Sequence, residues 1–260
     1  MSPDRLLDMV GQPGGPLADA ALYHLEVTET GPISQHMHRV VLTAPELGNF
    51  AFQAGQDLMF RVPRPEGEPL NRRYTMRRFD QAGAAVTVEV SLHANGPGTD
   101  WIRASSVGST IDAIGPRGKV TLRDGYDWHF FIADETGQPG ALAMMESMTP
   151  SSQALALFEV DGPSDEQQPV GAALPQVDIT WLHRLGATAP GDAAPLLDAL
   201  ASRALPPGRG HAYISAETKV VRALQRALEE KGLASDQISP KAYWRRGLPN
   251  RENGEPSKED

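Results

Sequence analysis

The chain has 260 residues, a hydrophobic content of 40%, a formal net charge of −9 and no cysteine. This length predicts two domains of ordinary size, each able to bury a core of its own. The absence of cysteine excludes disulfides, thiolate metal sites, iron–sulfur clusters and cysteine nucleophiles, and the acidic balance argues against nonspecific nucleic-acid binding. No apolar run approaches the roughly 18 residues of a membrane span, and the first residues lack the apolar stretch of a secretory signal, so we expect a cytoplasmic protein without membrane insertion.

The first half of the chain is built from short alternating segments separated by turn residues. Val86, Val88 and Val90 alternate with polar side chains, which is the period-two pattern of a half-buried strand. The same reasoning gives strands at 22–29, 39–43, 57–62, 72–79, 85–92, 109–114 and 119–122. Many strands at such short spacing predict an antiparallel β-barrel or β-sandwich.

The second half alternates dense apolar runs with helical stretches. The runs at 128–134, 154–160, 178–183 and 211–217 are typical of strands covered on both faces. The clearest helix is 218–231, where Thr218 is suited to cap the start, Val221, Leu224 and Leu228 fall on one face, and Gly232 suits the exit. Alternating strands and helices predict βαβ units and a mainly parallel sheet.

Together these patterns predict a β-barrel domain followed by an α/β domain of the nucleotide-binding type. We place the barrel at 1–124, the α/β domain at 125–247 and a polar, disordered tail at 248–260.

An arginine cluster stands out against the negative net charge. Residues 61–78 hold six arginines and only two acidic residues, which indicates a discrete anionic ligand. On a strand, Arg72 and Tyr74 share one face while Arg73 and Thr75 share the other. FAD needs a cation for its pyrophosphate, a flat partner for its ring system and a hydroxyl near N5, and R-x-Y-T supplies these three groups. The alternative is an edge strand with solvated arginines and a tyrosine in the core.

Six motifs occur in an order and spacing much more specific than any one of them. They are RRYTMRRFD at 72–80, HANGPGTDW at 93–101, IGPRG at 114–118, DWHFFIADET at 127–136, WLHRLGA at 181–187 and AYWRRG at 242–247. On these motifs the chain, from about residue 20 to 247, resembles the siderophore-interacting protein family, which are flavin-dependent reductases of ferric siderophores related to ferredoxin reductases. The resemblance implies a barrel that carries FAD and an α/β domain that presents the reductant.

The resemblance also implies three groups of binding residues. The FAD group is Arg72, Tyr74, Thr75, His93, Gly96, Gly98, Thr99 and Trp244. The nucleotide group, for an NAD(P)H donor, is Asp134, Glu135, Thr136 and Glu217. The arginines expected to attract an anionic iron chelate are Arg61, Arg73, Arg117, Arg245 and Arg246. We expect no catalytic side chain and no protein metal ligand, because the flavin carries the redox chemistry.

The implied activity is reduction of Fe(III) to Fe(II) in ferric siderophores, which weakens the hard oxygen ligation and releases the metal. The electrons would come from NAD(P)H or from a ferredoxin-like donor protein. The protein donor stays open because the sequence departs from the family at both turns expected to bind the nucleotide. Pro139 and Gly140 follow the D-E-T motif, and Ala216 precedes Glu217. Two other functions remain open. One is a general NAD(P)H:flavin reductase that releases its flavin, and the other is a noncatalytic iron-siderophore binding module.

Overall fold

The computed structural model describes residues 10–12, 20–64, 66–93, 95–171 and 174–247, so the predicted tail at 248–260 lies outside the described residues. The chain divides into two compact units, Met1–Thr121 and Leu122–Asp260. None of the helices in the described ranges is long and apolar enough to cross a membrane.

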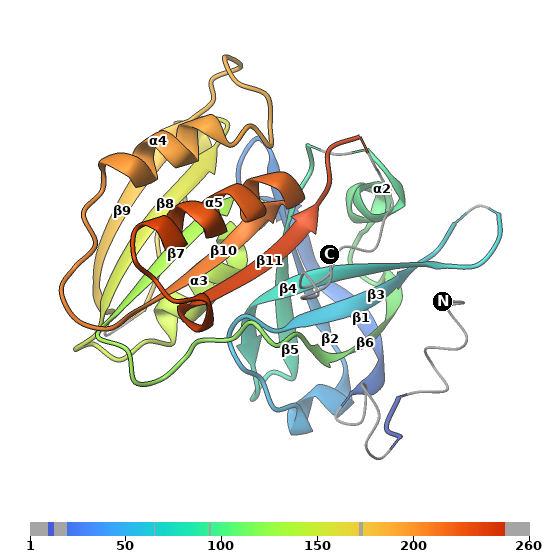
Figure 1. The fold of residues 1–260 in the computed structure, drawn as a ribbon. Helices are drawn as coiled ribbons and strands as arrows, with labels where there is room; N and C mark the ends of the chain where they lie inside the picture. Colours follow the sequence, from blue (N-terminus) through green and yellow to red (C-terminus); the bar gives the residue numbers. More distant parts are fainter. Residues whose placement is uncertain (1–9, 13–19, 65, 94, 172–173, 248–260) are drawn as a thin grey trace. The chain divides into compact units, whose positions relative to one another are not determined.

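The first unit is a closed barrel of antiparallel strands in the order β1-β2-β5-β4-β3-β6 (Figure 1), which confirms the barrel prediction. Its strands are β1 (Ala21–Pro32), β2 (Met37–Thr43), β3 (Asp57–Val62), β4 (Leu70–Asp80), β5 (Ala85–Ser91) and β6 (Thr110–Arg117). A short 3-10 helix, η1 (Pro45–Asn49), follows β2, and an α-helix, α2 (Pro97–Ala104), lies between β5 and β6. Closure pairs every strand on both sides and leaves no open sheet edge.

The barrel interior follows from the alternation in the sequence. Val86, Val88, Leu25, Phe60 and Met76 are all fully buried in one apolar cluster. The predicted strand at 119–122 was wrong, because β6 ends at Arg117 and the described segment 95–171 has no further strand before residue 128. Gly118 has a φ of 98°, a left-handed conformation that turns the chain out of the sheet.

The second unit is a parallel five-stranded sheet, which confirms the predicted mainly parallel sheet, and its strand order is β11-β10-β7-β8-β9. Its strands are β7 (Trp128–Asp134), β8 (Gln153–Val160), β9 (Gln176–His183), β10 (Gly210–Glu217) and β11 (Ile238–Trp244). The helices are α3 (Gln138–Glu146), α4 (Ala194–Ser202) and α5 (Thr218–Glu230), with 3-10 turns η2 (Pro163–Asp165) and η3 (Ser235–Gln237). Helices α4 and α5 cover one face of the sheet and α3 lies on the other (Figure 1).

Helix α5 has the predicted apolar face but a different cap. Leu224 and Leu228 are fully buried, and Gly232, with a φ of 99°, follows the helix end. The prediction that Thr218 caps the start was wrong. The side chain of Glu217 accepts hydrogen bonds from the backbone N–H groups of Lys219 and Val220. The carboxylate reaches the first turn and suits the positive helix end, so it takes the capping place.

The strand order reverses between β7 and β10. The chain runs from β7 to β8 and β9 on one side, then returns to β10 and β11 on the other. In parallel α/β sheets such a switch point opens a crevice at the carboxyl ends of the strands, where ligands bind. Asp134 and Glu217 are the last residues of the two strands that meet there.

Leu224→Ala should lower the free energy of unfolding by about 2–5 kcal/mol, because it leaves a cavity between α5 and the sheet. Denaturant unfolding measures this loss. The matched control is Leu185→Ala, since Leu185 is 70% exposed, and that substitution should stay within about 0.5 kcal/mol of the unmodified protein. Equal effects of the two substitutions would contradict the assignment of Leu224 to the core.

Candidate functional site

Three of the residues predicted to bind FAD meet in the first unit. Arg72 and Tyr74 lie on one face of β4, and Gly98 lies in the first turn of α2. A methyl group on Gly98 would overlap the Tyr74 hydroxyl and lie 3.3 Å from Cγ of Arg72. Only glycine allows the helix start to approach the strand this closely.

Tyr74 presents a neutral aromatic ring at this place. Its ring contacts Phe60 in an edge-to-face arrangement, with the ring centroids 5.1 Å apart. Burial raises the pKa of the Tyr74 phenol above its ordinary value, and the nearby Arg72 guanidinium acts in the opposite direction. The guanidinium and the ring are therefore neighbours, the combination that a phosphate joined to a flat ring system requires.

The start of α2 is free of a capping side chain. Gly96 precedes the helix with a φ of 155°, and within the described residues no capping hydrogen bond from a side chain is found at the first turn. Pro97 has no N–H, and the Thr99 hydroxyl donates to the Gly96 carbonyl at 2.9 Å. The first backbone N–H groups of a helix have no intrahelical acceptor and attract anions. Together with Arg72 they form a donor set that fits a pyrophosphate.

Thr75 and His93 make other contacts. Thr75 is buried on the opposite face of β4, where it pairs across the ladder with Asp57. The His93 ring stacks on His36, with centroids 4.2 Å apart, and the Leu92 N–H donates to the His36 carbonyl at 2.8 Å. The contact of His36 with the segment before α2 was missed, because nothing in the sequence pairs the β1–β2 turn with the end of β5.

The arginines of the barrel predicted to meet the substrate have partners within the barrel. Arg73 makes a two-pronged ion pair with the buried Asp57, with N–O distances of 2.9 and 2.6 Å. Arg117 donates to the sulfur of Met59, and Arg61 lies 3.9 Å from an Asp112 oxygen. Their role in substrate binding stays a prediction, and the Arg73 pair shows that part of the arginine cluster stabilises the barrel.

The two arginines after β11 differ from each other. The Arg246 guanidinium donates to the backbone carbonyls of Ala189 and Pro190. Arg245 is half-buried, and its side chain makes no hydrogen bond or ion pair with the part of the chain that the structure describes. Arg245 is therefore the better placed of the two to meet an anion from outside.

The nucleotide residues gather at the carboxyl edge of the second sheet, as expected for residues that end parallel strands. Asp134 accepts hydrogen bonds from the backbone N–H groups of Thr136 at 2.9 Å and Gly137 at 3.3 Å, in the turn that leads to α3. The Thr136 hydroxyl also donates to it, at 2.5 Å. Burial raises the pKa of Asp134, and these hydrogen bonds act against the shift. At the neighbouring strand, Glu217 caps α5.

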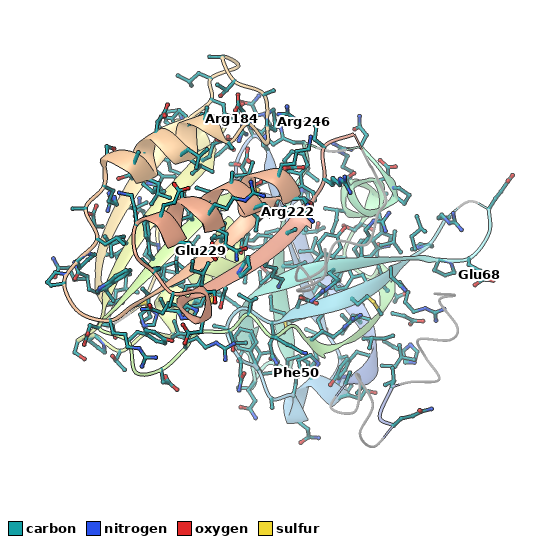
Figure 2. All side chains as sticks on the ribbon, viewed as in Figure 1. Phe50, Glu68, Arg184, Arg222, Glu229 and Arg246 are labelled. Carbon is teal, nitrogen blue, oxygen red and sulfur yellow. The ribbon has the colours of Figure 1, made fainter. Side chains whose placement is uncertain are left out.

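A buried ion cluster beside these residues was missed by the sequence reading. Arg184, 2% exposed and labelled in Figure 2, pairs with both Glu135 and Glu159, and its Nη1 atom lies 3.1 Å from Oε1 of Glu159. Burial raises the pKa of Glu159 to about 7, with further contributions from Asp134 and Asp192. The only available signal was Arg184 itself, one position after an apolar strand.

Comparison with known proteins divides the chain in the same way. The sequence model of the siderophore-interacting FAD-binding domain matches residues 53–120, and that of the siderophore-interacting protein matches residues 126–247. The chain is 31% identical over 193 residues to the ferric vibriobactin reductase ViuB of Vibrio cholerae, covering 72% of this chain and 69% of the relative. It is 25% identical to the NADPH-dependent ferric-chelate reductase of Escherichia coli, covering 87% and 94%. Among solved structures, a siderophore utilization protein from T. fusca has a TM-score of 0.81 at 29% identity, covering 90% and 96%.

Replacement of Glu159 should change how stability depends on pH. Because its pKa rises from 4.5 to about 7 in the folded protein, the folded state binds more protons than the unfolded state between these values. Stability from this group is therefore present below pH 4.5 and lost as the pH rises to about 7. Glu159→Gln keeps an oxygen for Arg184 and should flatten the curve of melting temperature against pH in this window.

The control for this measurement is Glu230→Gln, at the exposed end of α5. It should leave the shape of the curve unchanged. Parallel curves for the unmodified protein and Glu159→Gln would show that Glu159 titrates at an ordinary pH.

Proposed function

Because the chain belongs to the siderophore-interacting protein family, we propose that it is an FAD-dependent reductase of ferric siderophores that converts Fe(III) to Fe(II) and releases the metal in the cytoplasm. The observation that carries the proposal is the meeting of Arg72, Tyr74 and Gly98 at the uncapped start of α2. This meeting occurs inside the region that matches the FAD-binding domain. The names of the relatives from Vibrio cholerae and Escherichia coli support the substrate class.

The residues of the barrel have distinct roles in this proposal. Arg72 and the first N–H groups of α2 would hold the pyrophosphate, and Gly98 lets the backbone approach it. The Tyr74 ring would pack against a flat ring of the cofactor. FAD, when bound, would accept two electrons from the donor and pass them singly to iron. The roles of Thr75, His93, Gly96, Thr99 and Trp244 toward FAD stay predictions.

The substrate and the electron donor are proposed from chemistry and relatives. Ferric siderophores hold Fe(III) through hard oxygen ligands, and reduction weakens that preference. An anionic chelate would be attracted by Arg245, whose guanidinium has no partner in the described residues. The Escherichia coli relative is named as NADPH-dependent, so we propose NAD(P)H as the donor, with a ferredoxin-like protein as the alternative.

The first experiment is the visible absorption spectrum of the protein after incubation with FAD and desalting. Retained flavin bands, followed by trapping of Fe(II) when a ferric siderophore and a reductant are added, would support the proposal. Flavin that is lost on gel filtration but reduced in solution would instead indicate a general flavin reductase. A colourless protein that binds the ferric chelate would indicate a binding module.

Arg72→Ala should weaken FAD retention by roughly 10- to 100-fold, because a charge-assisted hydrogen bond to a phosphate contributes about 1.5–3 kcal/mol. Fluorescence titration of the apoprotein with FAD measures the affinity. The matched control is Arg78→Ala, since Arg78 is exposed on the same strand. Equal affinities of the two variants would remove Arg72 from the cofactor site.

Arg245→Gln should raise the Michaelis constant for anionic ferric chelates more than for neutral ones, since charge attraction acts on the anion alone. Steady-state rates of Fe(II) formation at low and high ionic strength measure the effect, which salt should reduce. Arg222→Gln, on α5 (Figure 2), removes the same charge at an exposed position and serves as the control. A similar change for both kinds of chelate would show that Arg245 does not sense substrate charge.

A further inference from the structure

Asp134 and Glu217, the two carboxylates at the switch point, each use their two oxygens to bind two different segments of the chain. One Asp134 oxygen, Oδ1, accepts from the turn that precedes α3, while the other, Oδ2, accepts from the indole N–H of Trp244 at 2.8 Å. In Glu217, Oε2 accepts from the start of α5, while Oε1 accepts from the Arg246 backbone N–H at 3.1 Å. Asp134 therefore links a strand-to-helix turn to the last residue of β11, and Glu217 links another to the segment just after it.

Trp244 is also held from other sides. Its carbonyl accepts a hydrogen bond from the Thr218 hydroxyl at 2.9 Å. Gly191, with a φ of 75°, lies against the ring so closely that a methyl group there would be 2.8 Å from Cη2 of Trp244 and 3.0 Å from Cγ of Glu217. The neighbouring carbonyls of Ala189 and Pro190 bind the Arg246 guanidinium. The indole ring thus has a fixed place and a fixed orientation at this edge of the sheet.

We propose that Asp134 and Glu217 are positioning residues that hold the segment 244–246, rather than ligands of the donor nucleotide. The N–H groups that a parallel α/β sheet offers to a phosphate lie in the first turns after its strands. Here those of Thr136 and Gly137, and those of Lys219 and Val220, already bind a carboxylate of the chain itself. A phosphate placed at either turn would have to displace a carboxylate of the chain from these N–H groups.

The charged groups around Asp134 support this division of roles. Glu159 lies close enough for Asp134 to raise its pKa, and the nearby cation Arg184 is held by Glu135 and Glu159. Burial raises the pKa of Asp134, and the hydrogen bond from the Trp244 indole is one of those that act against this shift. An asparagine at position 134 would turn an N–H group toward either the turn or the indole, so it cannot serve both partners.

The inference rests on the proposed function where it concerns reduction of the flavin by the nucleotide donor. Its first test needs no cofactor. The fluorescence emission of Trp244 is obtained by subtracting the emission spectrum of the Trp244→Phe variant from that of the unmodified protein, both without cofactor. Asp134→Asn should shift this difference spectrum to longer wavelength, because the indole loses its acceptor and becomes more solvated. The matched control is Asp178→Asn, which breaks an ion pair with Arg203 on the opposite end of the sheet and should leave the spectrum in place.

The second test is a double-mutant cycle on the donor step. Asp134→Asn, Trp244→Phe and the double variant are loaded with FAD, and flavin reduction is followed at increasing NADH or NADPH. If Asp134 acts through Trp244, its substitution should change the half-saturating donor concentration by about tenfold when the indole is present and by less than about twofold in the Trp244→Phe background. The same factor in both backgrounds, with an unshifted Trp244 emission, would overturn the proposal.

Loss of fold is checked by circular dichroism. If Asp134→Asn does not fold, Glu217→Gln takes its place, since it loosens the same segment from the other carboxylate, and an unshifted Trp244 emission there would also count against the proposal. Absence of flavin binding or of iron reduction would defeat the proposed function alone, because the emission test still decides the link between Asp134 and Trp244.

Discussion

Carboxylates at the ends of parallel strands organise the second unit. A strand that leads into a helix leaves backbone N–H groups without acceptors, and this chain satisfies them with Asp134 and Glu217. Because each carboxylate has two oxygens, the same residues can bind a further segment of the chain. The path of residues 244–246 and the contact of Gly191 with Trp244 both depend on this double use.

Buried carboxylates also organise the barrel, where their partners are arginine side chains. Several arginines of the barrel pair with these carboxylates. Arg73 is bound by the buried Asp57, and Arg77 and Arg39 flank the buried Glu89. A buried carboxylate needs such partners, since removal of one would leave an unpaired charge. The face of β4 that carries Arg72 and Tyr74 is thereby left for the approach of α2. The rigid closed barrel fixes that approach, which the close fit of Gly98 reflects.

Much of the architecture could be predicted because it depends on local periodicity. The alternation at 85–92 and the apolar face of α5 identify a strand and a helix from a few residues each. The grouping of Arg72 with Tyr74 also follows from the alternation of a strand. The pairing of Arg73 with Asp57 could not be predicted, because it depends on the register of β3 against β4. The capping of α5 by Glu217 was missed for a related reason. Thr218 has the better local propensity for a helix cap, but its hydroxyl donates a hydrogen bond to the carbonyl of Trp244, which is 26 positions away along the chain.

The starts of α2, α3 and α5 show why a sequence motif alone does not identify an anion site. Helix α2 begins after Gly96 without a capping side chain, and its first turn lies against the aliphatic part of the Arg72 side chain. The turn before α3 and the start of α5 also have glycine or small residues nearby, but a carboxylate of the chain fills each of them. An added anion gains N–H donors at α2, whereas at the other two it would have to displace a bound carboxylate. The acidic residues that precede a helix are therefore as informative as its glycines, because they decide whether the N–H groups remain open to a ligand.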